Sequence, residues 1–129
     1  MRIEALADHD RSSFSCGNAA LDEWFHRYST QNQRLGNART FVAIDGNSVV
    51  GFVSLSASQL VRAEAPERIA RNSPQYIPGI LIGRLAVDSR RQGEGIGTLL
   101  LSFALRRALD ISEQLGVRIV QVHEIDEDA

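Results

Sequence analysis

Residues 79–100, GILIGRLAVDSRRQGEGIGTLL, place an apolar run, a glycine-rich turn and the start of an apolar helical pattern in direct succession. Residues 79–87 are dense in Ile, Leu and Val, which predicts a buried strand. Glycines then occupy positions 93, 95 and 97. Glycine lets the backbone turn sharply and lets an anion approach without a Cβ atom in the way. Because amides that converge at a helix N-terminus favour negative charge, the stretch predicts a phosphate site.

Three kinds of phosphate-binding turn have glycine-rich sequences of this type. A Walker loop needs a lysine, and the chain contains none. A dinucleotide fingerprint needs glycine where Thr98 stands, and it belongs to a larger doubly wound sheet. The pattern Q/R-x-x-G-x-G/A, between a strand and a helix, matches residues 92–97. In that arrangement the Thr98 hydroxyl is a further donor, and Arg90 or Arg91 is placed to meet an outer phosphate.

The rest of the chain predicts alternating strands and helices around one mixed sheet, within a single domain spanning residues 1–129. Asn18 is expected to cap the first helix, whose apolar face would hold Leu21, Trp24, Phe25 and Tyr28. The second long helix is expected to bury one side and to end at Gly116. The predicted elements are a strand at 1–7, a helix at 18–33, strands at 40–44 and 49–58 joined by a turn at 45–47, a loop at 61–78, the strand at 79–87, the helix from about 96 to 115, and a strand at 117–122.

The amino-acid composition limits which partners and which cellular compartment we expect for the protein. The net charge is −2, but the acids of residues 124–128 leave residues 1–122 with 14 arginines against 12 acids. All basic residues are arginine, which suits phosphate contacts but is more simply explained by a GC-rich genome. We expect a cytoplasmic protein without a membrane partner, because neither an apolar span nor a signal peptide is present. The three histidines, His9, His26 and His123, lack metal-ligand spacing, so we assign no metal.

The apolar strand and the turn after it resemble the GNAT family of acyl-CoA-dependent N-acetyltransferases. The likeness rests on residues 83–88, GRLAVD, followed by residues 91–97, RQGEGIG. It implies acetyl-CoA as the acetyl donor and a largely antiparallel, three-layer α/β/α sheet of the α+β class. The backbone at Leu85, Ala86 and Val87 would then bind the pantetheine arm and polarise the thioester carbonyl. The pyrophosphate would be bound by the amides of Gln92, Gly93, Glu94, Gly95, Ile96, Gly97 and Thr98.

A narrower resemblance begins near the N-terminus and runs from about residue 11 to residue 129. Residues 14–25, FSCGNAALDEWF, together with residues 39–42 and 82–88, are similar to GNAT toxins of bacterial type II toxin–antitoxin systems. This implies acetylation of the α-amino group of aminoacyl-tRNA, and a small ribbon-helix-helix antitoxin as partner. Two alternatives stay open for an arginine group: a tRNA-facing patch, or a solvated face of mixed charge. Its members are Arg62, Arg68, Arg71, Arg84, Arg90 and Arg91.

The resemblance also implies a catalytic tyrosine on a helix after the strand at 117–122. That helix is expected to begin near residue 125, so the tyrosine would lie beyond Ala129 and the catalytic residue stays unassigned. The family's last two strands would likewise be missing. We therefore expect a C-terminally truncated GNAT domain whose strand at 117–122 has an open edge. A partner or a dimer mate would complete such an edge.

Two other functions remain open from the sequence. One is a GNAT acetyltransferase that acts on a small-molecule or peptide amine, which the modest basic balance allows. The other is a non-catalytic module that binds CoA or an antitoxin, which the absent tyrosine favours. The identity of the acetylated acceptor distinguishes this small-amine acetyltransferase from a tRNA-acetylating toxin. Measurable turnover distinguishes both enzymes from the non-catalytic module.

Overall fold

The five strands form one sheet in the order β1-β2-β3-β4-β5, seen here in a computed structural model that describes residues 1–125. Neighbouring strands are antiparallel except for β4 and β5, which are parallel. The sheet is therefore mixed and mostly antiparallel, as predicted. The strands are β1 (Arg2–Ala5), β2 (Arg39–Asp45), β3 (Ser48–Val61), β4 (Tyr76–Val87) and β5 (Ile119–Ile125).

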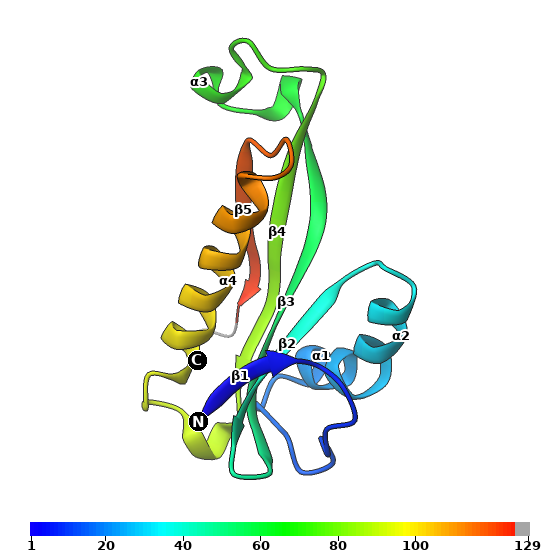
Figure 1. Ribbon diagram of the computed structural model, residues 1–129, viewed down its shortest axis with the longest axis vertical. Helices are drawn as coiled ribbons and strands as arrows, with labels where there is room; N and C mark the ends of the chain where they lie inside the picture. Colours follow the sequence, from blue (N-terminus) through cyan, green and yellow to red (C-terminus); the bar gives the residue numbers. More distant parts are fainter. Residues whose placement is uncertain (126–129) are drawn as a thin grey trace.

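Helices cover both faces of this sheet (Figure 1). On one face lies α4 (Ile96–Ser112), and on the other a helical segment made of α1 (Ala19–Glu23), η1 (Trp24–Tyr28) and α2 (Ser29–Arg34). Strand β2 contributes side chains to both faces of the sheet, because successive side chains along a strand point to opposite faces. Phe41 and Ala43 pack in the cluster with α4, whereas Val42 and Ile44 pack in the cluster with α1 and η1. The predicted three-layer arrangement is confirmed.

The first helical segment differs from the regular helix that was predicted. Its start is as expected, since the Asn18 side chain accepts hydrogen bonds from the amides of Ala20 and Leu21. Its middle turn, η1, is π-helical, and this wider turn rotates the residues that follow it. Phe25 is fully buried and Trp24 is half-buried, but Tyr28 is 42% exposed. The prediction that Tyr28 shares the buried face is therefore wrong.

Strands β3 and β4 extend well beyond the rest of the sheet as a two-stranded arm (Figure 1). The arm pairs out to Val61 and Tyr76, and its tip carries the short helices η2 (Arg62–Glu64) and α3 (Glu67–Ala70). The loop predicted at 61–78 is thus shorter, because part of it continues both strands. Its residues are mixed in character and partly exposed, so they lack the apolar alternation that would have revealed them.

The C-terminal elements also differ in extent from the prediction. Helix α4 ends at Ser112 rather than at Gly116, and Leu115, which lies beyond its end, is 65% exposed. Strand β5 runs through Ile125, where a new helix was expected to begin. The remainder of that expected helix, residues 126–129, lies outside the described residues. Within residues 1–125, β5 pairs with β4 alone, and no helix is long and apolar enough to cross a membrane.

Candidate functional site

Strand β4 contains a bulge that the sequence did not predict. Phe52 lies opposite Ala86 and Ser54 lies opposite Gly83, so β4 carries one more residue than β3 across this interval. The bulge includes Arg84, whose φ of 51° is rare for any residue other than glycine. Bulges bend a strand, re-aim its side chains and often lie beside active sites. This bulge directs the Arg84 guanidinium over the Trp24 ring, 4.6 Å from its centroid.

Beyond the bulge, one edge of β4 has little cover. The parallel pairing with β5 continues to Leu85, which lies in register with Ile125. Ala86 and Val87 have no strand partner on this side within the described part of the chain. The side chains of Leu85, Ala86 and Val87 are all buried. A ligand at this edge would therefore meet backbone groups rather than side chains.

The glycine turn follows at the end of β4, with an open space beside its backbone. Gly93 and Gly95 have φ values of 81° and 83°, and no heavy atom lies within 4 Å of a Cβ built on either residue. In α4 the Leu99 amide donates to the Gly95 carbonyl at 3.1 Å. The amides of residues 92–98 have no hydrogen-bond acceptor among residues 1–125. Free amides at the start of a 17-residue helix suit an anion.

The two arginines before the turn are engaged within the protein. Arg90 donates through Nε and Nη2 to the Asp88 carboxylate, each at 2.9 Å. Arg91 pairs with Glu94 at 2.9 Å and with Asp45 at 3.0 Å. The prediction that one of them meets an outer phosphate stays a prediction. An arginine in that role would have to bind the phosphate and its present carboxylate partner with the same guanidinium group.

Asp88 anchors the end of β4 and was missed by the sequence analysis. Its carboxylate is 2% exposed and caps η3 (Ser89–Arg91) by accepting from the Arg90 amide at 3.0 Å. Hydrogen bonds from the Arg90 side chain hold the pKa of the Asp88 carboxyl below its ordinary value. An aspartate directly after an apolar strand is a helix-capping signal, so the residue type could have revealed this role.

A cavity of about 470 Å³ opens beside the bulge, on the side of the first helical segment. Its walls combine aromatic, apolar and charged side chains, and Arg84 places it next to the bent part of β4. Tyr76 is not in its lining and lies at the start of β4, on the arm. The lining residues are Asn18, Ala20, Leu21, Glu23, Trp24, Tyr28 and Arg84.

A larger hollow of about 1030 Å³ lies between the C-terminal half of α4 and the sheet. Phe41, Ile80 and Arg107 are among its walls, and none of its lining residues belongs to the bulge or to the glycine turn. Size alone would favour this hollow. Because the bulge, the open β4 edge and the free amides meet elsewhere, we place the functional site at the bulge and the turn.

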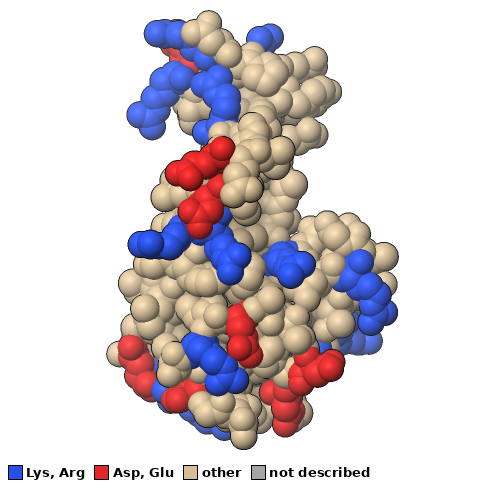
Figure 2. All heavy atoms as spheres, in the orientation of Figure 1, with Lys and Arg blue, Asp and Glu red and all other residues tan. Residues whose placement is uncertain are grey.

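The arginines proposed as one patch lie in separate places. Arg62, Arg68 and Arg71 are exposed at the tip of the arm, where Figure 2 shows a group of basic side chains. Arg90 and Arg91 follow the other end of β4. The twelve residues of β4 separate the two groups by roughly 36 Å. A single surface that includes all six arginines is therefore not formed.

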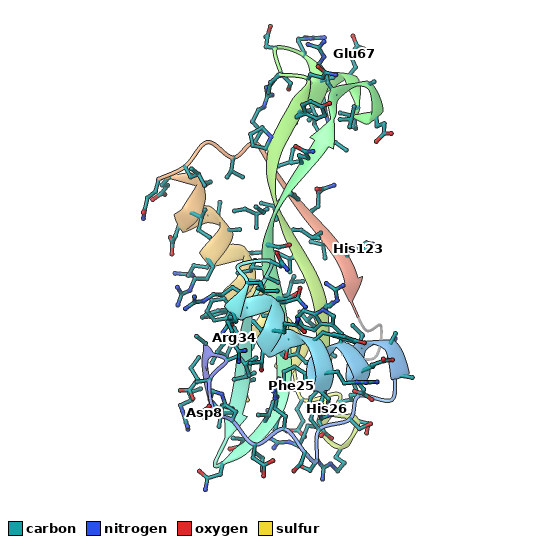
Figure 3. The ribbon with its side chains drawn as sticks, turned by 90° about the vertical axis from the view of Figure 1, so that its right-hand side faces the viewer. Asp8, Phe25, His26, Arg34, Glu67 and His123 are labelled. Carbon is teal, nitrogen blue, oxygen red and sulfur yellow. The ribbon has the colours of Figure 1, made fainter. Side chains whose placement is uncertain are left out.

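The histidines and acidic residues form no metal site in the described residues. His9 contacts Glu4 at 2.7 Å, and His26 contacts the Phe14 carbonyl at 2.8 Å. Figure 3 shows His26 on the helical segment and His123 on β5. Within residues 1–125 no group of three or more His, Cys, Asp or Glu side chains is arranged to hold a metal ion.

Comparison with known proteins extends these observations. A family described as "Acetyltransferase (GNAT) domain" matches residues 36–128. The chain is 38% identical over 120 residues to the tRNA-acetylating toxin of Mycobacterium tuberculosis, covering 93% of this chain and 72% of that protein.

Two solved structures extend the likeness to the fold. AtaT complexed with acetyl-methionyl-tRNAfMet is 27% identical with a TM-score of 0.84, covering 98% of this chain and 79% of that one. A mutant AtaT toxin bound to acetyl-CoA and to the C-terminus of the antitoxin AtaR is 26% identical with a TM-score of 0.78. That alignment covers 98% of this chain and 76% of the other. The similarity therefore extends over nearly the whole chain.

Proposed function

This chain belongs to the GNAT acetyltransferase family, and we propose that it transfers an acetyl group from acetyl-CoA to the α-amino group of aminoacyl-tRNA. It would do so in the cytoplasm, as one domain, and as the toxin of a toxin–antitoxin pair. The observation that carries the proposal is the continuity of the open β4 edge with the free amides of the glycine turn. The tRNA-acetylating relative supports the choice of acceptor.

The donor half of the site is assigned to backbone groups. Ala86 and Val87, with Leu85 at the end of the ladder, would bind the pantetheine arm along the β4 edge. The amides of residues 92–98 would bind the pyrophosphate, a role that suits the unfilled space beside Gly93 and Gly95. Bound acetyl-CoA would supply an activated thioester. The backbone of residues 85–87 would then be aimed at the thioester oxygen, where donors stabilise developing negative charge.

The acceptor half is assigned to the cavity beside Arg84. Its Trp24 and Tyr28 side chains and its position at the bulge would orient an aminoacyl group toward the end of β4. Holding two reactants in register contributes up to about 7–11 kcal/mol in well-oriented systems. The amine of an aminoacyl ester has a lowered pKa and is substantially neutral near pH 7. Positioning can therefore account for much of the rate without a strong general base.

The experiment that tests this function uses labelled acetyl-CoA, bulk aminoacyl-tRNA and a mixture of free amino acids and peptides. We expect label in the tRNA fraction that is lost on treatment with ribonuclease. Label in the free amines alone would replace this proposal with the small-amine acetyltransferase. Binding of acetyl-CoA without any transfer would replace it with the non-catalytic module.

The arm offers a basic surface for the RNA. Arg68 and Arg71 are exposed at its tip, and the eight residue steps along β4 from Tyr76 to Arg84 place that tip roughly 26 Å from the bulge. At this distance the arm tip can contact the acceptor stem of a tRNA whose aminoacyl end lies at the bulge. Figure 3 marks the tip by Glu67, which lies 3.8 Å from Arg71, so the surface is not purely basic.

Replacing Arg68 and Arg71 by alanine should raise the KM for aminoacyl-tRNA about five- to tenfold and leave acetyl-CoA binding unchanged. The reason is loss of two phosphate contacts, which should also lower the slope of log affinity against log salt by about 2. Steady-state kinetics at several salt concentrations measures both quantities. Arg106→Ala, an exposed arginine on α4, is the control. Equal KM values for the double variant and the control would remove the arm from tRNA recognition.

The protein partners follow from the same similarity. Binding of the antitoxin AtaR by AtaT supports an antitoxin partner for this chain, which we propose to be a ribbon-helix-helix protein. We also propose a homodimer. Val120 and Val122 of β5 are 39% and 50% exposed at the edge of the described sheet, an apolar surface of the kind that partners cover.

A further inference from the structure

The N-terminal stretch that the sequence analysis singled out, residues 14–25, joins the first helical segment to the glycine turn. Of its side chains, the proposed function names only that of Trp24. Within residues 13–16, which begin one residue before this stretch, Ser13, Ser15 and Cys16 form hydrogen bonds to residues of these two elements or of the end of β4. Phe14 anchors this segment because its ring is buried against Phe25 and Phe52, at centroid distances of 5.0 and 5.6 Å.

On one side, the segment is tied to the end of β4. The Ser15 amide donates to the Asp88 carboxylate at 3.4 Å, and the Ser89 amide donates to the Ser15 carbonyl at 2.9 Å. Arg90 extends this connection by donating from Nη2 to the Ser13 carbonyl at 3.2 Å. The same Arg90 is held by Asp88, so this carboxylate organises both the segment and the residues that lead into the turn.

On the other side, the segment is tied to the first turn of α1. Asp22 Oδ1 accepts from the Cys16 amide at 2.9 Å, and its Oδ2 accepts from the Ser15 hydroxyl at 3.1 Å. Ser15 is therefore held between two carboxylates, Asp22 through its hydroxyl and Asp88 through its amide. Asp22 itself does not contact the glycine turn in any described interaction.

Gln92 closes the connection at the first residue of the turn. Its Nε2 lies 3.5 Å from the Cys16 carbonyl and 3.4 Å from the Val87 carbonyl. A displacement of the Cys16 backbone would therefore also displace Gln92, the first residue of the run of free amides. Charge-assisted hydrogen bonds to a buried carboxylate are the strong links in such a chain.

We propose that Asp22 and Asp88 are positioning residues that act through Ser15 and Cys16 to hold the glycine turn in the geometry that binds the coenzyme pyrophosphate. This brace, residues 13–16 with Asp22 and Asp88, rests on the proposed acetyl-CoA site. It also joins the helix that lines the acceptor cavity to the donor half of the site. The sequence FSCGNAALD thereby gains a role distinct from core packing.

Calorimetric titration of acetyl-CoA into the unaltered chain and four variants tests the brace. Asp88→Asn should weaken binding about tenfold or more, and Asp22→Asn about three- to fivefold, because each loses hydrogen bonds to a charged group. The double variant should lose about as much affinity for acetyl-CoA as Asp88→Asn alone. Its fold loss should be well below the product of the two single losses, since both residues act through the same segment. Asp10→Asn is the matched control, because that carboxylate also accepts from nearby backbone and hydroxyl groups, those of Ser12.

A second measurement separates positioning from general destabilisation. Hydrogen exchange of the peptide that covers residues 92–98 should be faster in Asp22→Asn than in Asp10→Asn, at temperatures where both remain folded. If Asp22→Asn does not fold, Ser15→Ala replaces it, because it removes only the hydroxyl bond to Asp22.

The outcomes also distinguish the brace from the proposed function. Unaltered affinity in Asp22→Asn, or losses that multiply in the double variant, would overturn the brace while the acetyl-CoA site stands. Failure of the unaltered chain to bind acetyl-CoA would overturn the donor assignment, and the brace with it.

Discussion

Gly95→Glu should lower the affinity for acetyl-CoA by at least about 100-fold, to the point where calorimetric titration detects no binding. Two effects act together. Gly95 has a φ of 83°, where an L side chain costs about 1–2 kcal/mol. The new carboxylate would also stand at the run of free amides, where it takes the place of the pyrophosphate and repels it.

Gly36→Glu separates the strain from the charge. Gly36 has a φ of 78° and also has no heavy atom within 4 Å of a built Cβ, but it lies in the turn after α2. Its substitution should reduce stability similarly and leave acetyl-CoA binding within about twofold. If both variants bind as the unaltered chain does, the glycine turn is not the pyrophosphate site. If both lose binding, backbone strain rather than local charge is responsible.

The order and type of the main elements could be predicted because each buries a regular apolar pattern. Residues 79–87 are apolar on both faces, and both faces of β4 are covered by helices. The Asn18 cap and the turn at 45–47 follow from local chemistry that needs no tertiary context. The ends of the arm could not be predicted. Its strands extend beyond the helices, so neither face carries a continuous apolar pattern there.

The donor half of the site was visible in the sequence for a different reason. A turn that binds an anion through its backbone amides uses glycine where φ is positive, and the glycines at positions 93 and 95 are visible in the sequence. The bulge at Arg84 leaves no such mark, because an arginine there adopts a conformation that its type disfavours. Tertiary contacts must maintain it, among them the packing of the guanidinium on Trp24. The acceptor cavity beside it was accordingly missed.

Phe25→Ala should lower the free energy of unfolding by about 3–5 kcal/mol. Phe25 is fully buried, its ring stacks on Phe52 with centroids 4.2 Å apart, and the edge of Phe14 contacts it at 5.0 Å. Arg11 lies over the same ring at 5.2 Å. Truncation would leave a cavity at the centre of the helix–sheet contact. For a domain whose total stability is about 5–15 kcal/mol, the loss is a large fraction.

Tyr28→Ala is the informative partner of this variant, because regular helical spacing would place Tyr28 on the same buried face. The π-helical turn instead exposes 42% of Tyr28, so its truncation should cost less than about 1 kcal/mol. Chemical denaturation measures the free energy of unfolding of both variants. The dependence of this free energy on denaturant concentration should have the same slope in the variants as in the unaltered chain. Similar losses for the two variants would mean that the segment forms a regular helix in solution. The cavity beside Arg84 would then lose its Tyr28 wall, since that side chain would pack into the core instead.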